Sequence, residues 1–197
     1  MRPRFPLVTV QPMNSILQQE SPASRTRPLS EAPVLAEAAV RMLCTPSALA
    51  GFTDAEARTV VACMRRVSYP EGAMVMREGD QVHTGYMLLL LEGEVSVETS
   101  ADGSGVEISV LGPGNLFGEM ALLDGEPRSV SCRAVTRIEA AGLSREALAM
   151  LLRDSPVVCA KLMTLMAQRL ADRLRAAGDQ LRMYAHLLGT LRDDRAR

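Results

Sequence analysis

The hydrophobic pattern between residues 68 and 143 constrains the fold of this chain most, because its period is 2 and not the helical 3.6. Residues 94–99 and 107–110 alternate apolar and polar side chains, as half-buried strands do. Ten of the fourteen glycines fall within residues 72–125, at intervals that suit turns. Many short strands joined by such turns predict a mainly β fold, a small antiparallel barrel or jelly roll.

Helical patterns flank this β region on both sides. Apolar side chains recur at helical spacing within residues 34–67, where Thr53 and Glu56 have the spacing of a capping box. After the β region, Ser144 is a suitable N-cap for a helix over residues 145–153. We therefore expect an N-terminal helical bundle before the barrel in the sequence and C-terminal helices after it.

The longest helix is predicted to begin at Pro156, because proline suits the first position of a helix. Beyond it, apolar residues recur in alternating steps of three and four for about four heptads, as in a coiled coil. A seam of this length is too long and narrow to serve only as a lid for the barrel. The alternative is a seam that packs on the chain's own barrel. The seam residues are Leu170, Leu174, Ala177, Leu181, Tyr184 and Leu188.

Composition divides the chain into four parts. Residues 1–33 contain six of the eleven prolines, with serine, glutamine and four arginines, and have no sustained apolar period. That composition predicts a disordered arm. Residues 34–155 are expected to form the barrel with its N-terminal helices, residues 156–191 the long dimerisation and lid helix, and residues 192–197 a polar tail.

Residues 117–129 place one carboxylate and one guanidinium in a glycine-punctuated turn. Gly118 lacks a Cβ and permits positive φ, so consecutive N–H groups can converge on an anion. Arg128 offers a planar fork that matches two phosphate oxygens. The carboxylate of Glu119 is an acceptor, and its natural partner is a hydroxyl such as that of a ribose. The alternative is a polar hairpin turn with an exposed ion pair between Glu119 and Arg128.

The 18 residues from 117 to 134 resemble the phosphate-binding cassette of the cyclic nucleotide-binding domain family. Segments 78–80, 91–95 and 111–114 resemble other recurrent stretches of that family. The resemblance implies backbone N–H groups from Gly118 and Ala121, a ribose contact from Glu119, and phosphate contacts from Arg128 and Ser129. The ligand-binding residues expected from it are Gly118, Glu119, Met120, Ala121, Arg128, Ser129 and Val130.

In the activator proteins of this family the corresponding helix pairs two subunits and its residues close over the purine, so the resemblance implies a parallel homodimer of that kind. It aligns Ala177 and Gly178 with a base-contacting pair, yet neither has a side chain that can hydrogen-bond. Base recognition is then expected to be apolar or to come from Arg175, Gln180 or Arg182, which leaves the base preference open. The predicted base or lid contacts are Arg175, Ala177, Gly178 and Leu181.

Bulk properties exclude several other functions. The chain has 22 basic and 23 acidic side chains and a formal net charge of −1, which marks no nucleic-acid or membrane surface. No apolar run approaches the roughly 18 residues that span a bilayer. We therefore expect a soluble, cytoplasmic protein.

Metal and catalytic sites are not expected, and neither is a cofactor. A cupin-like enzyme needs several histidines and carboxylates converging in the barrel, whereas His83 is the one histidine of the strand region. No Ser-His-Asp or Cys-His arrangement is evident. The four cysteines, expected to be buried and free of disulfides, are Cys44, Cys63, Cys132 and Cys159.

These features predict a non-enzymatic sensor that binds cyclic AMP or cyclic GMP and signals to an effector protein of unknown identity. It is expected to stand alone without a helix-turn-helix or other DNA-binding element, because residues 192–197 are a polar tail. One alternative is an interaction protein that keeps this fold and dimerises without binding nucleotide. Another is a transcription regulator related to the catabolite activator protein that lacks its DNA-binding domain.

Overall fold

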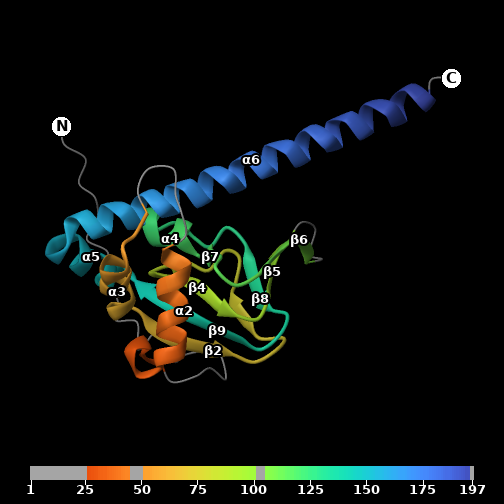
Figure 1. Ribbon diagram of the computed structural model, residues 1–197. Helices are drawn as coiled ribbons and strands as arrows, with labels where there is room; N and C mark the ends of the chain where they lie inside the picture. Colours follow the sequence, from red (N-terminus) through yellow and green to blue (C-terminus); the bar gives the residue numbers. More distant parts are fainter. Residues whose placement is uncertain (1–25, 45–50, 101–104, 196–197) are drawn as a thin grey trace, which may run out of the picture.

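The computed structural model describes residues 26–44, 51–100 and 105–195, and side chains as far as His186. These residues form two antiparallel sheets, with most of the helices gathered on one side (Figure 1). The five-stranded sheet has the order β1-β2-β9-β4-β7, and the four-stranded sheet the order β3-β8-β5-β6. The strands are β1 (Arg27–Pro28), β2 (Arg65–Tyr69), β3 (Met74–Met76), β4 (Tyr86–Glu92), β5 (Val95–Thr99), β6 (Val106–Leu111), β7 (Leu116–Phe117), β8 (Ser131–Ala134) and β9 (Ile138–Ser144).

The central strand β4 is buried on both faces and separates two apolar cores. Leu88 and Leu90 point into a core between the two sheets, while Met87, Leu89 and Leu91 point into a core beneath the helices. This division follows the period of 2 of a strand. The mainly β jelly-roll class predicted from the sequence is confirmed, although the described strands form two facing sheets and not a closed barrel.

The N-terminal helices are η1 (Leu29–Glu31), α2 (Pro33–Leu43) and α3 (Asp54–Ala62). The predicted capping box begins α3: the N–H of Glu56 donates to Oγ1 of Thr53 at 3.3 Å, and the N–H of Thr53 donates to Oε2 of Glu56 at 2.8 Å. Nζ of Lys161 also donates to Oε2 of Glu56, at 2.6 Å. The N-terminal bundle is therefore fastened to the long C-terminal helix.

The disordered arm predicted over residues 1–33 does not extend to residue 33. Strand β1 pairs with β2, and the N–H of Leu29 donates to the carbonyl of Met64 at 3.1 Å. The side chain of Leu29 is fully buried in the helical core, which fixes this segment. Pro33 lies at the first position of α2, where a proline needs no hydrogen bond. Residues 1–25 of the predicted arm lie outside the described residues.

Strand β6 is more exposed than the half-buried strand that the sequence predicts. Ile108 and Val110 are 46% and 48% exposed, and every residue from Val106 to Val110 is classed as exposed. β6 lies at the edge of the four-stranded sheet and pairs with β5 alone. Its apolar side chains are consequently left about half exposed by the sheets and helices of the described residues.

Two helices follow the last strand: α5 (Arg145–Asp154) and α6 (Pro156–Arg195), with α4 (Glu119–Asp124) lying earlier, after β7. The N–H of Ala147 donates to Oγ of Ser144, which is the predicted N-cap, and α6 begins at the predicted Pro156. Figure 1 shows α6 crossing the body of the molecule and projecting beyond it. Because α6 continues to Arg195, the polar tail predicted over residues 192–197 is helical in its first four residues.

The predicted heptad seam is exposed along the projecting part of α6. Leu174, Leu181 and Tyr184 are 75%, 69% and 58% exposed, whereas Leu162 and Met166 earlier in the helix are buried. The alternative of a seam packed on the chain's own sheets is therefore wrong for these three exposed residues. The side chain of Leu188 lies outside the described part of the chain, and the homodimer remains a prediction.

Candidate functional site

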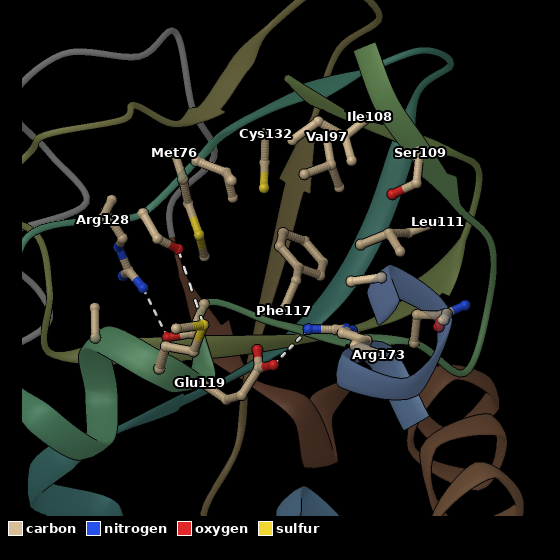
Figure 2. A pocket seen from close by; sticks show the side chains of 18 of the residues that line it. Met76, Val97, Ile108, Ser109, Leu111, Phe117, Glu119, Arg128, Cys132 and Arg173 are labelled. Carbon is tan, nitrogen blue, oxygen red and sulfur yellow. Dashed lines mark hydrogen bonds and ion pairs between the residues drawn. The ribbon is translucent and has the colours of Figure 1, made fainter. Parts of the chain in front are cut away.

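A pocket of about 450 Å³ opens between the four-stranded sheet, α4 and α6 (Figure 2). Its walls are mainly apolar, with Val97 from β5, Ile108 and Leu111 from β6, and Phe117 from β7. A cavity of that size, apolar with a few polar groups, suits a small organic ligand. The polar or charged side chains that line it are Ser109, Asn115, Glu119, Arg128, Ser129, Arg173 and Gln180.

Gly118 forms the sharp turn at the floor of the pocket and is the N-cap of α4, with φ of 77°. A Cβ at this position would lie 2.5 Å from Cε of Met76 and 2.7 Å from Nη1 of Arg128. Glycine is therefore required both by the left-handed backbone and by the space. The turn brings the Gly118 carbonyl against the arginine, and directs the following residue, Glu119, into the pocket (Figure 2).

Arg128 is 4% exposed and is held by backbone carbonyls. Nε and Nη2 donate to the carbonyl of His83 at 3.0 and 2.7 Å, Nη2 donates to that of Tyr86 at 2.9 Å, and Nη1 donates to that of Gly118 at 2.7 Å. The guanidinium also lies 4.7 Å from the centroid of the Tyr86 ring. Burial lowers the pKa of Arg128, and no described carboxylate forms an ion pair with it. Within the described part of the chain, the site thus contains a buried cation without an anionic partner.

Glu119 is 1% exposed and is paired with an arginine of α6. Nη1 of Arg173 donates to Oε1 of Glu119 (Figure 2), and Nη2 of Arg173 donates to the carbonyl of Leu116. The long helix is therefore tied to the floor of the pocket by one side chain. The sequence analysis predicted Glu119 as a site residue. It predicted neither Arg173 nor the ion pair between the two.

The structure brings together most of the predicted site residues. Gly118, Glu119, Met120, Ala121, Arg128, Ser129, Val130 and Ala177 all line the pocket. Arg128 and Glu119 do not form the exposed ion pair of the hairpin alternative, because both are buried and have other partners.

Three of the predicted base or lid contacts lie outside the pocket lining: Arg175, Gly178 and Leu181. Arg175 instead pairs with Asp172 on the surface of α6, at 2.5 Å. The reason is helical geometry, because residues three, four and seven apart share a face. Arg173, Ala176, Ala177 and Gln180 share the face that lines the pocket, whereas Arg175 and Gly178 lie on other faces. The exposed seam, with Leu181, runs beside the pocket face and shares Ala177 with it.

Cys132 lies in the apolar part of the pocket, and burial raises the pKa of its thiol to about 12. A thiol with such a pKa stays protonated at neutral pH and behaves as a small apolar side chain. The other three cysteines are also free thiols. Among the residues that the structure describes, no cluster of three or more histidine, cysteine or acidic side chains is placed to hold a metal ion.

The pocket therefore has one charged end and mainly apolar walls elsewhere. One end offers a buried carboxylate and a buried guanidinium that pairs with no carboxylate of the described residues, and the remaining walls are mainly apolar. Such a site suits a ligand that has an anionic group, a neighbouring hydroxyl and an apolar or aromatic part. Fold and site together define the class: a jelly-roll ligand-binding domain for a small anionic molecule.

Comparison with known proteins makes this class specific. The family model of the cyclic nucleotide-binding domain matches residues 66–155. A crystal structure of a cyclic nucleotide-binding domain from Methylobacillus flagellatus superimposes with a TM-score of 0.70 and 31% sequence identity, over 76% of this chain and 83% of that one. The chain belongs to the cyclic nucleotide-binding domain family.

Two bacterial regulators show the same relationship over longer chains. The CRP-like cAMP-activated global transcriptional regulator of Mycobacterium tuberculosis is 29% identical over 70% of this chain and 57% of its own length. The cyclic AMP receptor protein of Thermus thermophilus is 36% identical over 62% of this chain and 56% of its own. The crystal structure of the Thermus thermophilus catabolite activator protein superimposes with a TM-score of 0.58 and 34% identity, over 68% of this chain and 61% of that one. This chain spans a little over half the length of the two regulators.

In the described part of the chain, no helix is long and apolar enough to cross a membrane.

Proposed function

We propose that this chain is a regulatory protein that binds a 3′,5′-cyclic mononucleotide, cyclic AMP or cyclic GMP, in the pocket. The observation that carries the proposal is the buried guanidinium of Arg128, which lacks a carboxylate partner among the described residues. Of the five N–H groups of an arginine, four are used by carbonyls, so that one on Nη1 remains for a ligand at the pocket wall. A phosphate would accept that bond and supply the missing counter-charge.

The other parts of a cyclic nucleotide fit the remaining lining. Glu119 would accept a hydrogen bond from the ribose 2′-hydroxyl beside Arg173, and Ser129 lies next to Arg128 for a second phosphate contact. The base would lie against the apolar side chains of β5, β6 and α6. Because Arg173 ties Glu119 to α6, a ligand that engages Glu119 would bias the position of that helix, and this change is the proposed signal.

Isothermal titration calorimetry of the 197-residue chain with cyclic AMP and with cyclic GMP tests the proposal directly. We expect saturable binding of at least one of the two nucleotides. Absence of heat and of a thermal shift with both would contradict it, and would favour an interaction protein with this fold that binds no nucleotide.

Replacing Glu119 with glutamine is expected to weaken cyclic AMP binding about tenfold or more. The amide keeps the shape of the side chain but loses the charge-assisted acceptor for the ribose hydroxyl and for Arg173. A ligand control sharpens the test, because 2′-deoxy cyclic AMP lacks that hydroxyl. It should bind the unmodified chain weakly, and the substitution should change its affinity little.

The matched protein control is Glu126→Gln, an exposed glutamate of the same segment. Its affinity for cyclic AMP is expected to stay within about twofold of the unmodified chain. Equal losses of affinity for cyclic AMP and its 2′-deoxy analogue in Glu119→Gln would remove Glu119 from the ribose site.

We also propose that the exposed seam of α6 pairs two copies of this chain. Leu174→Asp places a charge in the seam and removes apolar contact area, so the variant is expected to be a monomer of about 21.3 kDa by multi-angle light scattering. Met183→Asp, at another apolar and exposed residue that lies off the seam, should remain a dimer. A monomeric unmodified chain would contradict the dimer.

A further inference from the structure

Helix α4, which carries the floor of the pocket, is held at each end by a different arginine. At its start, Nη1 of Arg128 donates to the carbonyl of Gly118 at 2.7 Å. At its end, Nη2 and Nε of Arg145 donate to the carbonyls of Ala121 and Leu122, at 2.8 and 3.1 Å. Arg145 is the first residue of α5 and does not line the pocket. We infer that Arg145 is a positioning residue that connects ligand binding at α4 to the movement of α5 and α6; this inference rests on the proposed function.

The two arginines are joined by a closed set of hydrogen bonds. The N–H of Arg145 donates to the carbonyl of Gly85 at 2.9 Å, and the next carbonyl, that of Tyr86, accepts Nη2 of Arg128 at 2.9 Å. On the other side, the N–H of Leu122 donates to the carbonyl of Gly118 at 3.4 Å, which joins the two ends of α4. A phosphate that draws Arg128 toward the pocket therefore acts on the same short segments that Arg145 holds.

A purely local role for Arg145, as a cap of α4, accounts for its bond to Leu122 but not for the whole arrangement. The helix already ends in a glycine cap, in which the N–H of Gly125 donates to the carbonyl of Ala121 at 3.0 Å. Arg145 adds a second bond to that carbonyl, from a different element. What the arginine contributes beyond the glycine is a rigid connection between α4 and α5.

The connection continues into the long helix. α5 ends at Asp154, and α6 begins two residues later at Pro156, so that a displacement of α5 is passed to α6. α6 in turn contacts the floor of the pocket through Arg173 and Glu119. The ligand would thus act on α6 from two directions: directly through Glu119, and through α4, Arg145 and α5. A contiguous set of bonds of this kind can couple two sites, and the coupling can be measured.

The test compares Arg145→Ala with Arg145→Lys, and uses Arg153→Ala as the matched control. Arg153 lies in the same helix and carries the same charge, but it is exposed and pairs with Asp154. By calorimetry, cyclic AMP affinity is expected to fall about tenfold in Arg145→Ala, less in Arg145→Lys, where one donor can still reach a carbonyl, and not at all in Arg153→Ala.

The second readout is hydrogen exchange of the full chain, with and without cyclic AMP at a concentration that saturates each variant. In the unmodified chain and in Arg153→Ala, cyclic AMP is expected to change exchange in α4, α5 and the first half of α6. In Arg145→Ala the change in α4 should persist while that in α5 is lost, and Arg145→Lys should restore it in part. If Arg145 were only a cap of α4, its replacement would change hydrogen exchange in α4, but α4 and α5 would still respond to cyclic AMP together.

Three results would overturn the inference while the proposed function stands. They are an unchanged affinity together with an unchanged α5 response in Arg145→Ala, an equal loss in Arg153→Ala, or no difference between Arg145→Lys and Arg145→Ala. Absence of cyclic nucleotide binding by the unmodified chain is a different result, and it would overturn the proposed function and this inference together.

Discussion

Replacing Arg128 with leucine is expected to reduce cyclic AMP affinity by roughly a hundredfold or more, because it removes the proposed phosphate contact, the one buried cation among the described residues of the pocket. The same substitution should also destabilise the fold. It leaves the carbonyls of His83, Gly118 and Tyr86 without their donor, at a cost of about 2–4 kcal/mol. Calorimetry measures the first effect, and the thermal midpoint measures the second.

Two variants separate these effects. Arg128→Lys keeps a charge at the site and should lose less of both affinity and stability, since an ammonium can bond some of the carbonyls but cannot reproduce the planar fork. Arg133→Leu removes a nearby arginine that pairs with Glu98 and lies outside the pocket lining, and it should bind cyclic AMP as the unmodified chain does. Normal affinity in a folded Arg128→Leu variant would contradict the phosphate assignment.

Gly118→Ala is expected to weaken cyclic AMP binding about tenfold or more and to lower stability. The left-handed backbone of Gly118 costs an alanine about 1 kcal/mol. Its Cβ would also lie 2.5 Å from Cε of Met76 and 2.7 Å from Nη1 of Arg128, so that the arginine must leave its position. Calorimetry and thermal unfolding of the same sample measure both effects.

The control for backbone strain is Gly72→Ala. Gly72 has the same φ of 77°, but a Cβ there would meet nothing within 4 Å. This variant should share the loss of stability and keep the affinity. Gly178→Ala, within α6 and in open space, should instead gain about 1 kcal/mol of helix stability. If Gly118→Ala binds cyclic AMP as tightly as Gly72→Ala does, the close approach of Arg128 to the turn has no role in the site.

The phosphate and ribose end of the site could be predicted from the sequence because its parts are local. Gly118, Glu119 and Arg128 lie within one short stretch, so their chemical roles can be inferred without knowing the rest of the fold. Arg173 could not be read in this way, because it lies 54 residues from Glu119 and meets it only through the docking of α6. The spacing of residues on a helix could have predicted it. Once Ala177 is assigned to the pocket, Arg173 and Gln180, four and three residues away, lie on the same face, and Arg175 does not.

Two other differences between the predicted and the observed fold have a common physical origin. The hydrophobic pattern and the composition of a segment do not show which other elements pack over it. The alternation of β6 correctly indicates a two-faced strand, but its edge position leaves the apolar face uncovered. Residues 26–33 share the polar, proline-rich composition of the arm before them. The pairing of β1 with β2 and the buried side chain of Leu29 anchor them to the core.

The unbroken length of α6 has a mechanical consequence. From Arg173 to Arg195 the helix runs 22 residues, about 33 Å at 1.5 Å per residue. A tilt of about 10° at Arg173 would carry the far end through about 6 Å, roughly the rise of one helical turn. The helix is thus a lever arm with its pivot at the pocket, and it would turn a rearrangement of one ion pair into a displacement that a binding partner can detect.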